Sequence, residues 1–196
     1  RIARELHDGI GQSLSAVKFG VENGLKEINK ETAGPRGKRL EAVIPMIQDS
    51  IEEVRKIAMD LRPSVLDDLG ILATIAWFCR EFQTIYSGIR IEQQLDIREG
   101  EVPDPLKTAI YRVLQEALNN VAKHSNANLA NISLRRMGGM IGLVIEDNGM
   151  GFDLEEASRK GLGLSSMKER IELSDGSFTI ESAKGAGTII RAIWRQ

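Results

Sequence analysis

Two stripes of apolar side chains with helical spacing occupy the first part of the chain. Over residues 1–30 the apolar positions lie three or four residues apart, at Ile2, Leu6, Ile10, Leu14, Val17, Val21, Leu25 and Ile28. A second stripe alternates steps of four and three, at Leu40, Ile44, Ile47, Ile51, Val54, Ala58 and Leu61. Both patterns are typical of amphipathic helices, and the second is a heptad pattern.

A turn signal lies between the two stripes at residues 33–37, which contain two glycines and a proline. We therefore predict an antiparallel hairpin of two long helices. Pro45 lies within the second stripe and should kink the first turns of that helix or delay its start. Because one hairpin cannot bury both stripes well, we expect two copies to form a dimeric four-helix bundle.

The helical patterns become shorter after Pro63, which should end the second helix. We expect a linker at residues 66–70, where two aspartates precede a glycine, and a helix over 71–86. Asp104 is expected to cap a further helix that starts at Pro105 and runs to about residue 124.

Alternating apolar residues predict strands in the rest of the chain. The pair around Gly138 and Gly139 is typical of a β-hairpin. A helix over 162–173 is also expected, and the predicted strands cover 89–95, 130–134, 141–145, 177–182 and 188–194. Helices and antiparallel strands in this proportion indicate an α+β sandwich. We therefore predict a helical hairpin over residues 1–65 and an α/β domain over 66–196.

Composition narrows the class of protein. With 196 residues and 42% hydrophobic side chains, the chain can bury a sizeable core. A net charge of −2 argues against a nucleic-acid or anionic-membrane surface. Cys79 is the single cysteine, which excludes an internal disulfide and fits a reducing compartment. The sequence contains no apolar run of membrane-spanning length and no signal peptide.

The start of the chain predicts that more sequence precedes it. The first residue is not a methionine and already belongs to a helical pattern. We therefore expect a fragment of a longer protein, whose preceding part could contain a membrane span.

A first candidate site lies at residues 147–151, Asp-Asn-Gly-Met-Gly, directly after a predicted strand. Asp147 continues the phase of Ile141, Leu143 and Ile145, so its carboxylate should point inward. A buried carboxylate needs a partner, and an adenine amino group would serve. Gly149 and Gly151 would let the backbone approach a ligand closely. The alternative is an ordinary turn.

Three further motifs favour a nucleotide. Gly161, Gly163 and Leu164 open a predicted helix, whose free N–H groups suit phosphate oxygens. Residues 185–188, which end at Thr188, form either a tight turn or a backbone approach to the nucleotide.

The third motif is a polar helix face made by Glu116, Asn120 and Lys123, opposite an apolar stripe. A carboxylate, an amide oxygen and an ammonium can hold Mg²⁺ and phosphate. The alternative is a solvated face with an Arg112–Glu116 pair.

The order and spacing of these motifs resemble the ATP-binding superfamily of gyrase, heat-shock chaperone, histidine kinase and mismatch-repair proteins (the GHKL or Bergerat fold), over roughly residues 68–196. The resemblance implies ATP and Mg²⁺ as cofactors. It implies Asp147 on the adenine amino group, Asn120 on Mg²⁺, and Lys123 and His124 near the phosphates. Glu116 would be a catalytic or metal-organising acid. The expected pocket also includes Gly149, Gly151, Gly161, Gly163, Leu164 and Thr188.

Two features depart from the superfamily, and one residue, His124, has a second explanation. The segment over residues 152–160, which should cover the ATP, is short, and residues 173–176 lack the paired glycines of relatives. A histidine such as His124 is also favourable in the last turn of a helix without any ligand.

The first helix completes the resemblance. Leu6-His7-Asp8 with Gln12 resemble the phosphoacceptor motif of sensor histidine kinases of the nitrate-sensor and desaturase-thermosensor subfamily, as does the junction over residues 61–70. In this interpretation His7 attacks the γ-phosphate of ATP and Asp8 orients the imidazole and acts as base. Asp8 could also be a solvated charge. Gln12, whose amide can orient water, would act in dephosphorylation of the partner.

The resemblance implies a homodimer that transfers its phosphoryl group to the receiver domain of a response regulator, without contacting nucleic acid itself. It also implies the cytoplasmic portion of a sensor, attached to a membrane only through a missing N-terminal region. Two alternatives remain open. One is a serine-directed protein kinase or ATPase of the same superfamily in which His7 is incidental, and the other is a dimeric scaffold that binds nucleotide without turnover.

Overall fold

The structure is a computed structural model that describes residues 10, 12–28, 43–48, 50–51, 64–154 and 164–195. The chain divides into two compact units, residues 1–64 and 65–196, and each is described by itself. Among these described residues, none of the helices combines the length and the apolar character needed to cross a membrane.

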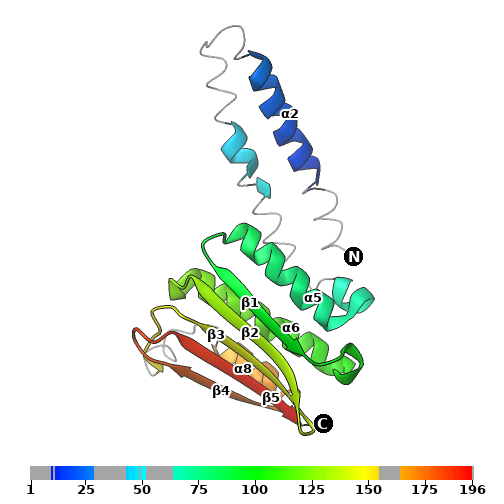
Figure 1. The fold of residues 1–196 in the computed structure, drawn as a ribbon, viewed down its shortest axis with the longest axis vertical. Helices are drawn as coiled ribbons and strands as arrows, with labels where there is room; N and C mark the ends of the chain where they lie inside the picture. Colours follow the sequence, from blue (N-terminus) through cyan, green and yellow to red (C-terminus); the bar gives the residue numbers. More distant parts are fainter. Residues whose placement is uncertain are drawn as a thin grey trace. The chain divides into compact units, whose positions relative to one another are not determined.

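The described residues of the first unit are helical, as the apolar stripes predict. Helix α2 (Gln12–Ile28) is followed by helical residues 43–48 and 50–51 (Figure 1). Lys18 donates a hydrogen bond from Nζ to Gln48 Oε1 at 2.8 Å, so the two helical segments lie side by side. Ile47 and Ile51 of the second stripe are buried, whereas Val17 of the first stripe is 54% exposed. One chain therefore leaves part of its apolar surface uncovered.

The second unit is built on a five-stranded sheet with the order β1-β2-β3-β5-β4. The strands are β1 (Arg90–Asp96), β2 (Leu129–Met137), β3 (Met140–Asp147), β4 (Gly176–Ser182) and β5 (Thr188–Arg195). The predicted α+β class and the β2–β3 hairpin are confirmed. The expectation of antiparallel strands is wrong for β1 and β2, which are parallel. Helix α6 (Asp104–Asn120) lies between them in the chain, and such a crossover connects parallel neighbours.

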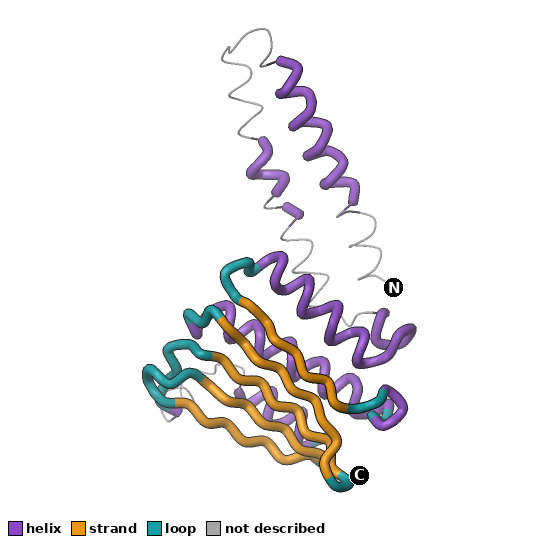
Figure 2. The backbone as a smooth tube through the Cα atoms, in the orientation of Figure 1, coloured by secondary structure: helices purple, strands orange, loops and turns teal. Residues whose placement is uncertain are grey.

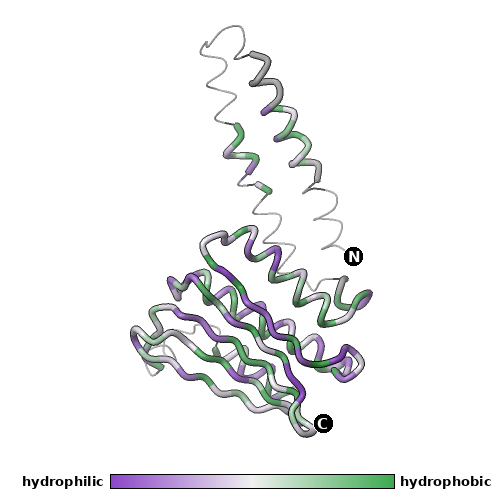
Figure 3. Tube along the Cα trace, in the orientation of Figure 1, coloured by the Kyte–Doolittle hydropathy of each residue, from purple (hydrophilic) through white to green (hydrophobic). Residues whose placement is uncertain are grey.

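The core lies between one face of the sheet and three helices. Hydrophobic and hydrophilic positions alternate along strands of the sheet (Figure 3). The side chains of Ala130, Ile132 and Leu134 in β2 and of Ile141, Leu143 and Ile145 in β3 are buried. Helices α6 and α8 (Leu164–Glu172) lie behind the sheet in the view of Figure 2, and α5 (Ser64–Ile85) lies along the β1 side. Phe78 of α5 meets Tyr111 of α6 edge-on, with ring centroids 5.5 Å apart. This packing fixes α6 over the sheet, where it carries Asn120 at its end.

The linker predicted at residues 66–70 is wrong, because these residues belong to α5. Leu66 is buried, so the first turn of α5 packs in the core of the second unit. The helix has a kink at Gly70, whose φ of 83° is in the left-handed region. This φ strains any residue that has a side chain, and a Cβ atom there would also lie 2.2 Å from Glu99 Oε1, so glycine is strongly favoured.

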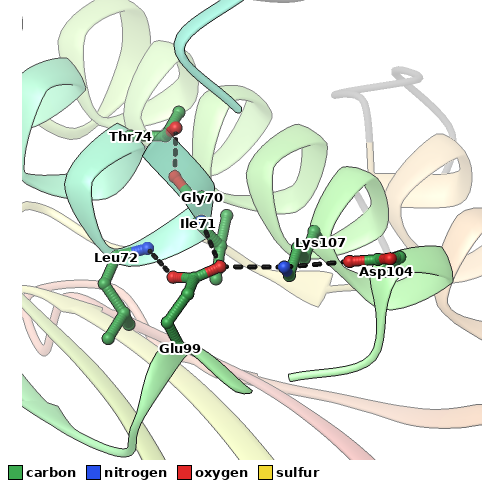
Figure 4. A network of polar contacts seen from close by, with 7 residues as sticks. All are labelled: Gly70, Ile71, Leu72, Thr74, Glu99, Asp104 and Lys107. Atoms are coloured by element: carbon green, nitrogen blue, oxygen red, sulfur yellow. Dashed lines mark hydrogen bonds and ion pairs between the residues drawn. The ribbon is translucent and has the colours of Figure 1, made fainter. Parts of the chain in front are cut away.

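Glu99 lies where it accepts the N–H groups that the kink leaves without helical partners (Figure 4). Its oxygens accept from Ile71 N at 2.9 Å and from Leu72 N at 3.0 Å. Lys107 Nζ lies 2.9 Å from Glu99 Oε1 and 2.9 Å from Asp104 Oδ1. The predicted cap at Asp104 is therefore wrong: α6 begins at Asp104, Pro103 precedes it as the cap residue, and the Asp104 carboxylate pairs with Lys107.

Candidate nucleotide site

The second unit contains a cavity between the end of α6, strands β3 and β5, and the start of α8. Six predicted site residues line it: Asn120, His124, Asp147, Gly151, Leu164 and Thr188. The other lining residues are Ala117, Val121, Ser125, Ile145, Phe152 and Ile190. The structure therefore brings at least one residue of each of the four predicted motifs to one cavity: Asn120, Asp147, Leu164 and Thr188.

Asp147 supplies a buried carboxylate at the end of β3. Its side chain is 8% exposed, in phase with the buried residues of the strand. Oδ1 accepts the N–H of Gly149 at 2.8 Å, and the Thr188 hydroxyl, paired across β5, also forms a hydrogen bond with the carboxylate. Burial raises the pKa of Asp147 above its usual value, and the Gly149 and Thr188 bonds partly offset this rise. The site therefore holds an acceptor in mostly apolar surroundings.

Ile145 and Ile190 form the apolar part of the cavity next to this carboxylate. Each lies two positions from a predicted polar residue, Asp147 or Thr188, on the same face of its strand. Neither isoleucine was predicted as a site residue, although the period of two in a strand was the signal that could have found them. A flat apolar ring that carries an amino donor matches this combination of apolar walls and one acceptor.

Glycines at the ends of β3 and β5 let three backbone segments meet. A Cβ atom on Gly149 would lie 2.3 Å from Ser125 O, and one on Gly151 would lie 2.0 Å from Ala183 O. For the motif at residues 185–188, a Cβ atom on Gly187 would lie 2.0 Å from Asp147 O. The motif at residues 185–188 therefore approaches the backbone of Asp147. Gly149, Gly151 and Gly187 allow the backbone segments around the Asp147 carboxylate to pack closely.

The end of the helix that carries Asn120 differs from the regular α-helix that was predicted. Residues after Asn120 form a π-helical turn, η3 (Val121–Ser125). The hydrogen bonds of a π-helix span five residues, so its turn is wider. His124, four residues after Asn120, lines the same cavity, whereas Lys123 does not, although both residues are exposed.

Of the three residues predicted on the polar helix face, Asn120 lines the cavity, and Glu116 and Lys123 do not. Glu116 lies one turn before Asn120, is half-buried and is not among the lining residues. Arg112, the partner of Glu116 in the alternative prediction, donates a hydrogen bond to Gln115 Oε1 at 2.7 Å.

Several predicted residues cannot be placed. His7, Asp8, Gly161 and Gly163 lie outside the described residues, as does most of the predicted covering segment. Gln12 is the first residue of α2.

Two family models together match most of the chain. The model described as histidine kinase matches residues 1–66. The model described as histidine kinase-, DNA gyrase B-, and HSP90-like ATPase matches residues 106–196. The second match contains the whole cavity described above.

Curated relatives match nearly the whole chain. Oxygen sensor histidine kinase NreB of Staphylococcus carnosus is 34% identical over 191 residues, which are 97% of this chain and 54% of that protein. The histidine-protein kinase/phosphatase DegS of Brevibacillus brevis is 32% identical over 191 residues, 97% of this chain and 49% of that protein. The chain thus spans about half the length of these relatives.

The fold also has solved neighbours. The histidine kinase domain of the blue-light activated histidine kinase EL346 from Erythrobacter litoralis superposes with a TM-score of 0.59 at 15% identity, covering 92% of this chain and 94% of that one. At this identity the likeness concerns the fold alone.

Proposed function

Since this chain belongs to the sensor histidine kinases of two-component systems, with a histidine kinase region followed by an ATPase domain, we propose that it phosphorylates itself on His7 with ATP. The phosphoryl group then passes to an aspartate in the receiver domain of a response regulator. The observation that carries this proposal is the buried Asp147 carboxylate in a mostly apolar cavity of the ATPase domain.

The cavity residues divide into a base-binding part and a phosphate-binding part. Asp147 accepts a hydrogen bond from the adenine amino group, and Ile145 and Ile190 pack against the ring. Asn120 and His124 lie on the part of the cavity formed by α6 and η3 and face the phosphates. The buried carboxylate distinguishes adenine, which donates from its amino group, from a base that offers an acceptor there.

The Mg²⁺ ion that such a domain uses would be held by the Asn120 amide oxygen together with phosphate oxygens, and Glu116 lies one turn before Asn120. Within the described ranges, no cluster of three or more histidine, cysteine or acidic side chains could hold a metal by itself. This donor set fits Mg²⁺, which is usually bound by one or two protein oxygens and by its substrate's phosphates. The ion supplies charge neutralisation on the triphosphate.

His7 is the nucleophile of the first reaction. One ring nitrogen bonds to the γ-phosphorus, the bond from this phosphorus to its bridging oxygen breaks, and ADP leaves with the electron pair. The proton on the other ring nitrogen passes to Asp8, so that neutral phosphohistidine results. The second step transfers the phosphoryl group to the receiver carboxylate, and Gln12 orients water when the receiver is dephosphorylated.

A homodimer is the assembly we propose for the first unit. Ile10 and Val17 belong to the predicted apolar stripe and are 47% and 54% exposed in one chain. A second copy that covers them would complete a four-helix bundle. We further propose that the chain is the cytoplasmic part of a sensor, with residues 1–65 as phosphoacceptor domain and 66–196 as catalytic domain.

Incubation with Mg²⁺ and γ-labelled ATP tests the function. Wild type should acquire a label that acid removes and alkali does not, as expected of phosphohistidine, and His7→Gln should acquire none. His7→Gln should still bind ADP, which shows that its catalytic domain is intact. Equal labelling of both proteins would overturn the proposal. An acid-stable label on a separate protein would instead support a serine-directed kinase.

A further inference from the structure

Asn148 joins the loop after β3 to the start of β2 through its side chain. Its Oδ1 accepts the backbone N–H groups of Asn128 and Leu129, both at 3.1 Å. Its Nδ2 donates to Asn128 Oδ1 at 2.8 Å, and its own N–H donates to Leu129 O at 3.2 Å. Because two N–H groups face Oδ1, the amide can lie only one way round. One exposed side chain thus makes three bonds to one segment.

The segment that Asn148 holds is itself continuous with the π-helical wall of the cavity. The Ser125 hydroxyl donates to Val121 O at 2.8 Å and accepts the N–H of Ala127 at 3.0 Å. Asn126 between them is left-handed, with a φ of 53°. The turn from η3 into β2 is therefore fixed by side-chain hydrogen bonds at both of its ends.

The loop after β3 also contacts this turn directly. Met150 donates its N–H to Ser125 O at 2.7 Å, and the space that a Gly149 side chain would need is filled by Ser125. Gly149 in turn donates to the Asp147 carboxylate. The orientation of the Asp147 carboxylate therefore depends on the loop after β3. Residues 148–150 of this loop contact the segment 125–129, which begins at the end of η3.

We propose that Asn148 is a positioning residue for nucleotide binding, an inference that rests on the proposed function. Asn148 is not among the residues that line the cavity. Its amide holds the loop 147–151 against the segment 125–129, and thereby holds the Asp147 carboxylate at a fixed separation from the η3 wall. The effect on the nucleotide is transmitted through Asp147 and Gly149.

The chemistry of the side chain gives a graded set of variants. Asn148→Ala removes all three side-chain bonds, whereas Asn148→Asp keeps an oxygen that accepts the two N–H groups and loses only the Nδ2 donor. Asn128→Ala is the matched control, because it removes the same Nδ2 bond from the other side and leaves both N–H bonds to Asn148 Oδ1 in place. Asn128 and Asn148 are exposed, so water can reach the groups that each change leaves unpaired, and the variants should fold.

The test is the dissociation constant of the full chain for ADP, which cannot phosphorylate His7, together with the kinetics of autophosphorylation. We expect Asn148→Ala to raise the Kd for ADP by about tenfold, because three hydrogen bonds, each contributing about 0.5 kcal/mol at this exposed position, are lost. Asn128→Ala should change it by no more than about twofold, and Asn148→Asp should recover most of the lost affinity. The KM for ATP should rise in Asn148→Ala while kcat stays unchanged.

The outcomes separate the inference from the proposed function. Wild type that does not bind ADP would overturn the proposed function. Wild type that binds ADP, with an equal Kd in Asn148→Ala, would overturn the positioning role alone. Asn148→Asp that binds as weakly as Asn148→Ala would also overturn it, since acceptance of the two N–H groups would then not be what matters.

Discussion

The contact between Glu99 and the kink at Gly70 allows a quantitative test of how α5 is held. Glu99 accepts the N–H groups of Ile71 and Leu72, the first two residues after the kink, as an N-cap side chain does. Loss of such a cap costs about 0.5–2 kcal/mol. In Glu99→Ala we expect the free energy of unfolding to fall by about 1–2 kcal/mol, because Lys107 also loses one of its two anionic partners.

Gly70→Ala should be more destabilising, because two costs combine. A left-handed backbone costs about 1–2 kcal/mol for a residue with a Cβ atom. This atom would also lie 2.2 Å from Glu99 Oε1, so the carboxylate must move away and its two N–H bonds are lost. We expect a total loss of about 2–4 kcal/mol. The double variant Gly70→Ala/Glu99→Ala should be about as stable as Gly70→Ala, which corresponds to a coupling energy of about 1–2 kcal/mol.

Urea unfolding followed by tryptophan fluorescence measures these differences. The chain has two tryptophans, Trp77 in α5 and Trp194 in β5, so the signal reports on the second unit alone. Glu181→Ala is the control, since it removes an exposed ion pair with Arg191 that should contribute less than about 1 kcal/mol. Additive effects of Gly70→Ala and Glu99→Ala, within about 0.5 kcal/mol, would refute the reasoning.

The pH dependence of the same difference has a definite sign. Burial raises the pKa of Glu99, but the hydrogen bonds from Leu72, Lys107 and Ile71 outweigh it and hold the pKa below its ordinary 4.5. A carboxylate with a lowered folded pKa stabilises the protein fully above its unfolded value and loses this effect as the pH falls through the folded pKa. The stability difference between wild type and Glu99→Ala should be constant from pH 7 to about pH 5.5 and shrink below the unfolded value. A difference that grows with acidification would contradict this assignment.

Three further predictions concern the cavity. Asp147→Asn keeps an acceptor for Gly149 but removes a buried charge. ADP binding should therefore weaken at least about tenfold, while the free energy of unfolding in urea at pH 7 stays equal or rises. A lower free energy of unfolding would contradict this prediction. Gly187→Ala should cost more than about 2 kcal/mol of unfolding free energy, whereas Gly185→Ala, at a similar φ with open space around it, should cost only about 1–2 kcal/mol; equal losses would refute the packing role. His124→Gln should raise the KM for ATP more than Lys123→Gln, because His124 lines the cavity and Lys123 does not. The reverse order would contradict a phosphate-binding role for His124.

The predictable parts of this protein are those whose cause lies within one element. Asp147 was placed inward because it continues the two-residue period of its strand, and the structure buries it. The hairpin around Gly138 and Gly139 was likewise predictable, since both glycines adopt the positive φ that a two-residue turn requires.

The errors have causes that lie far away in the sequence. Residues 66–70 were expected to be a linker because two aspartates precede a glycine there. Glu99, more than twenty residues later, supplies the acceptors that let a helix restart after Gly70. The parallel pairing of β1 and β2 depends on the path of α6 and has no local signal. The π-helical turn after Asn120 also lacks a local signature. Both Lys123 and His124 were expected near the phosphates, and of these two residues His124 lines the cavity.

The glycines of the site acquire a different explanation when these contacts are considered together. Their sequence pattern suggested backbone that approaches a nucleotide, whereas Gly149, Gly151 and Gly187 each meet a backbone carbonyl of the protein itself. The carbonyls belong to Ser125, Ala183 and Asp147, on three different segments around the same carboxylate. The side chain of Asp147 can therefore recognise an amino group without a ligand to organise it, because the loops around it are already in contact through their backbones. Substitutions at these glycines should consequently reduce stability and nucleotide affinity together, whereas Asp147→Asn should separate the two.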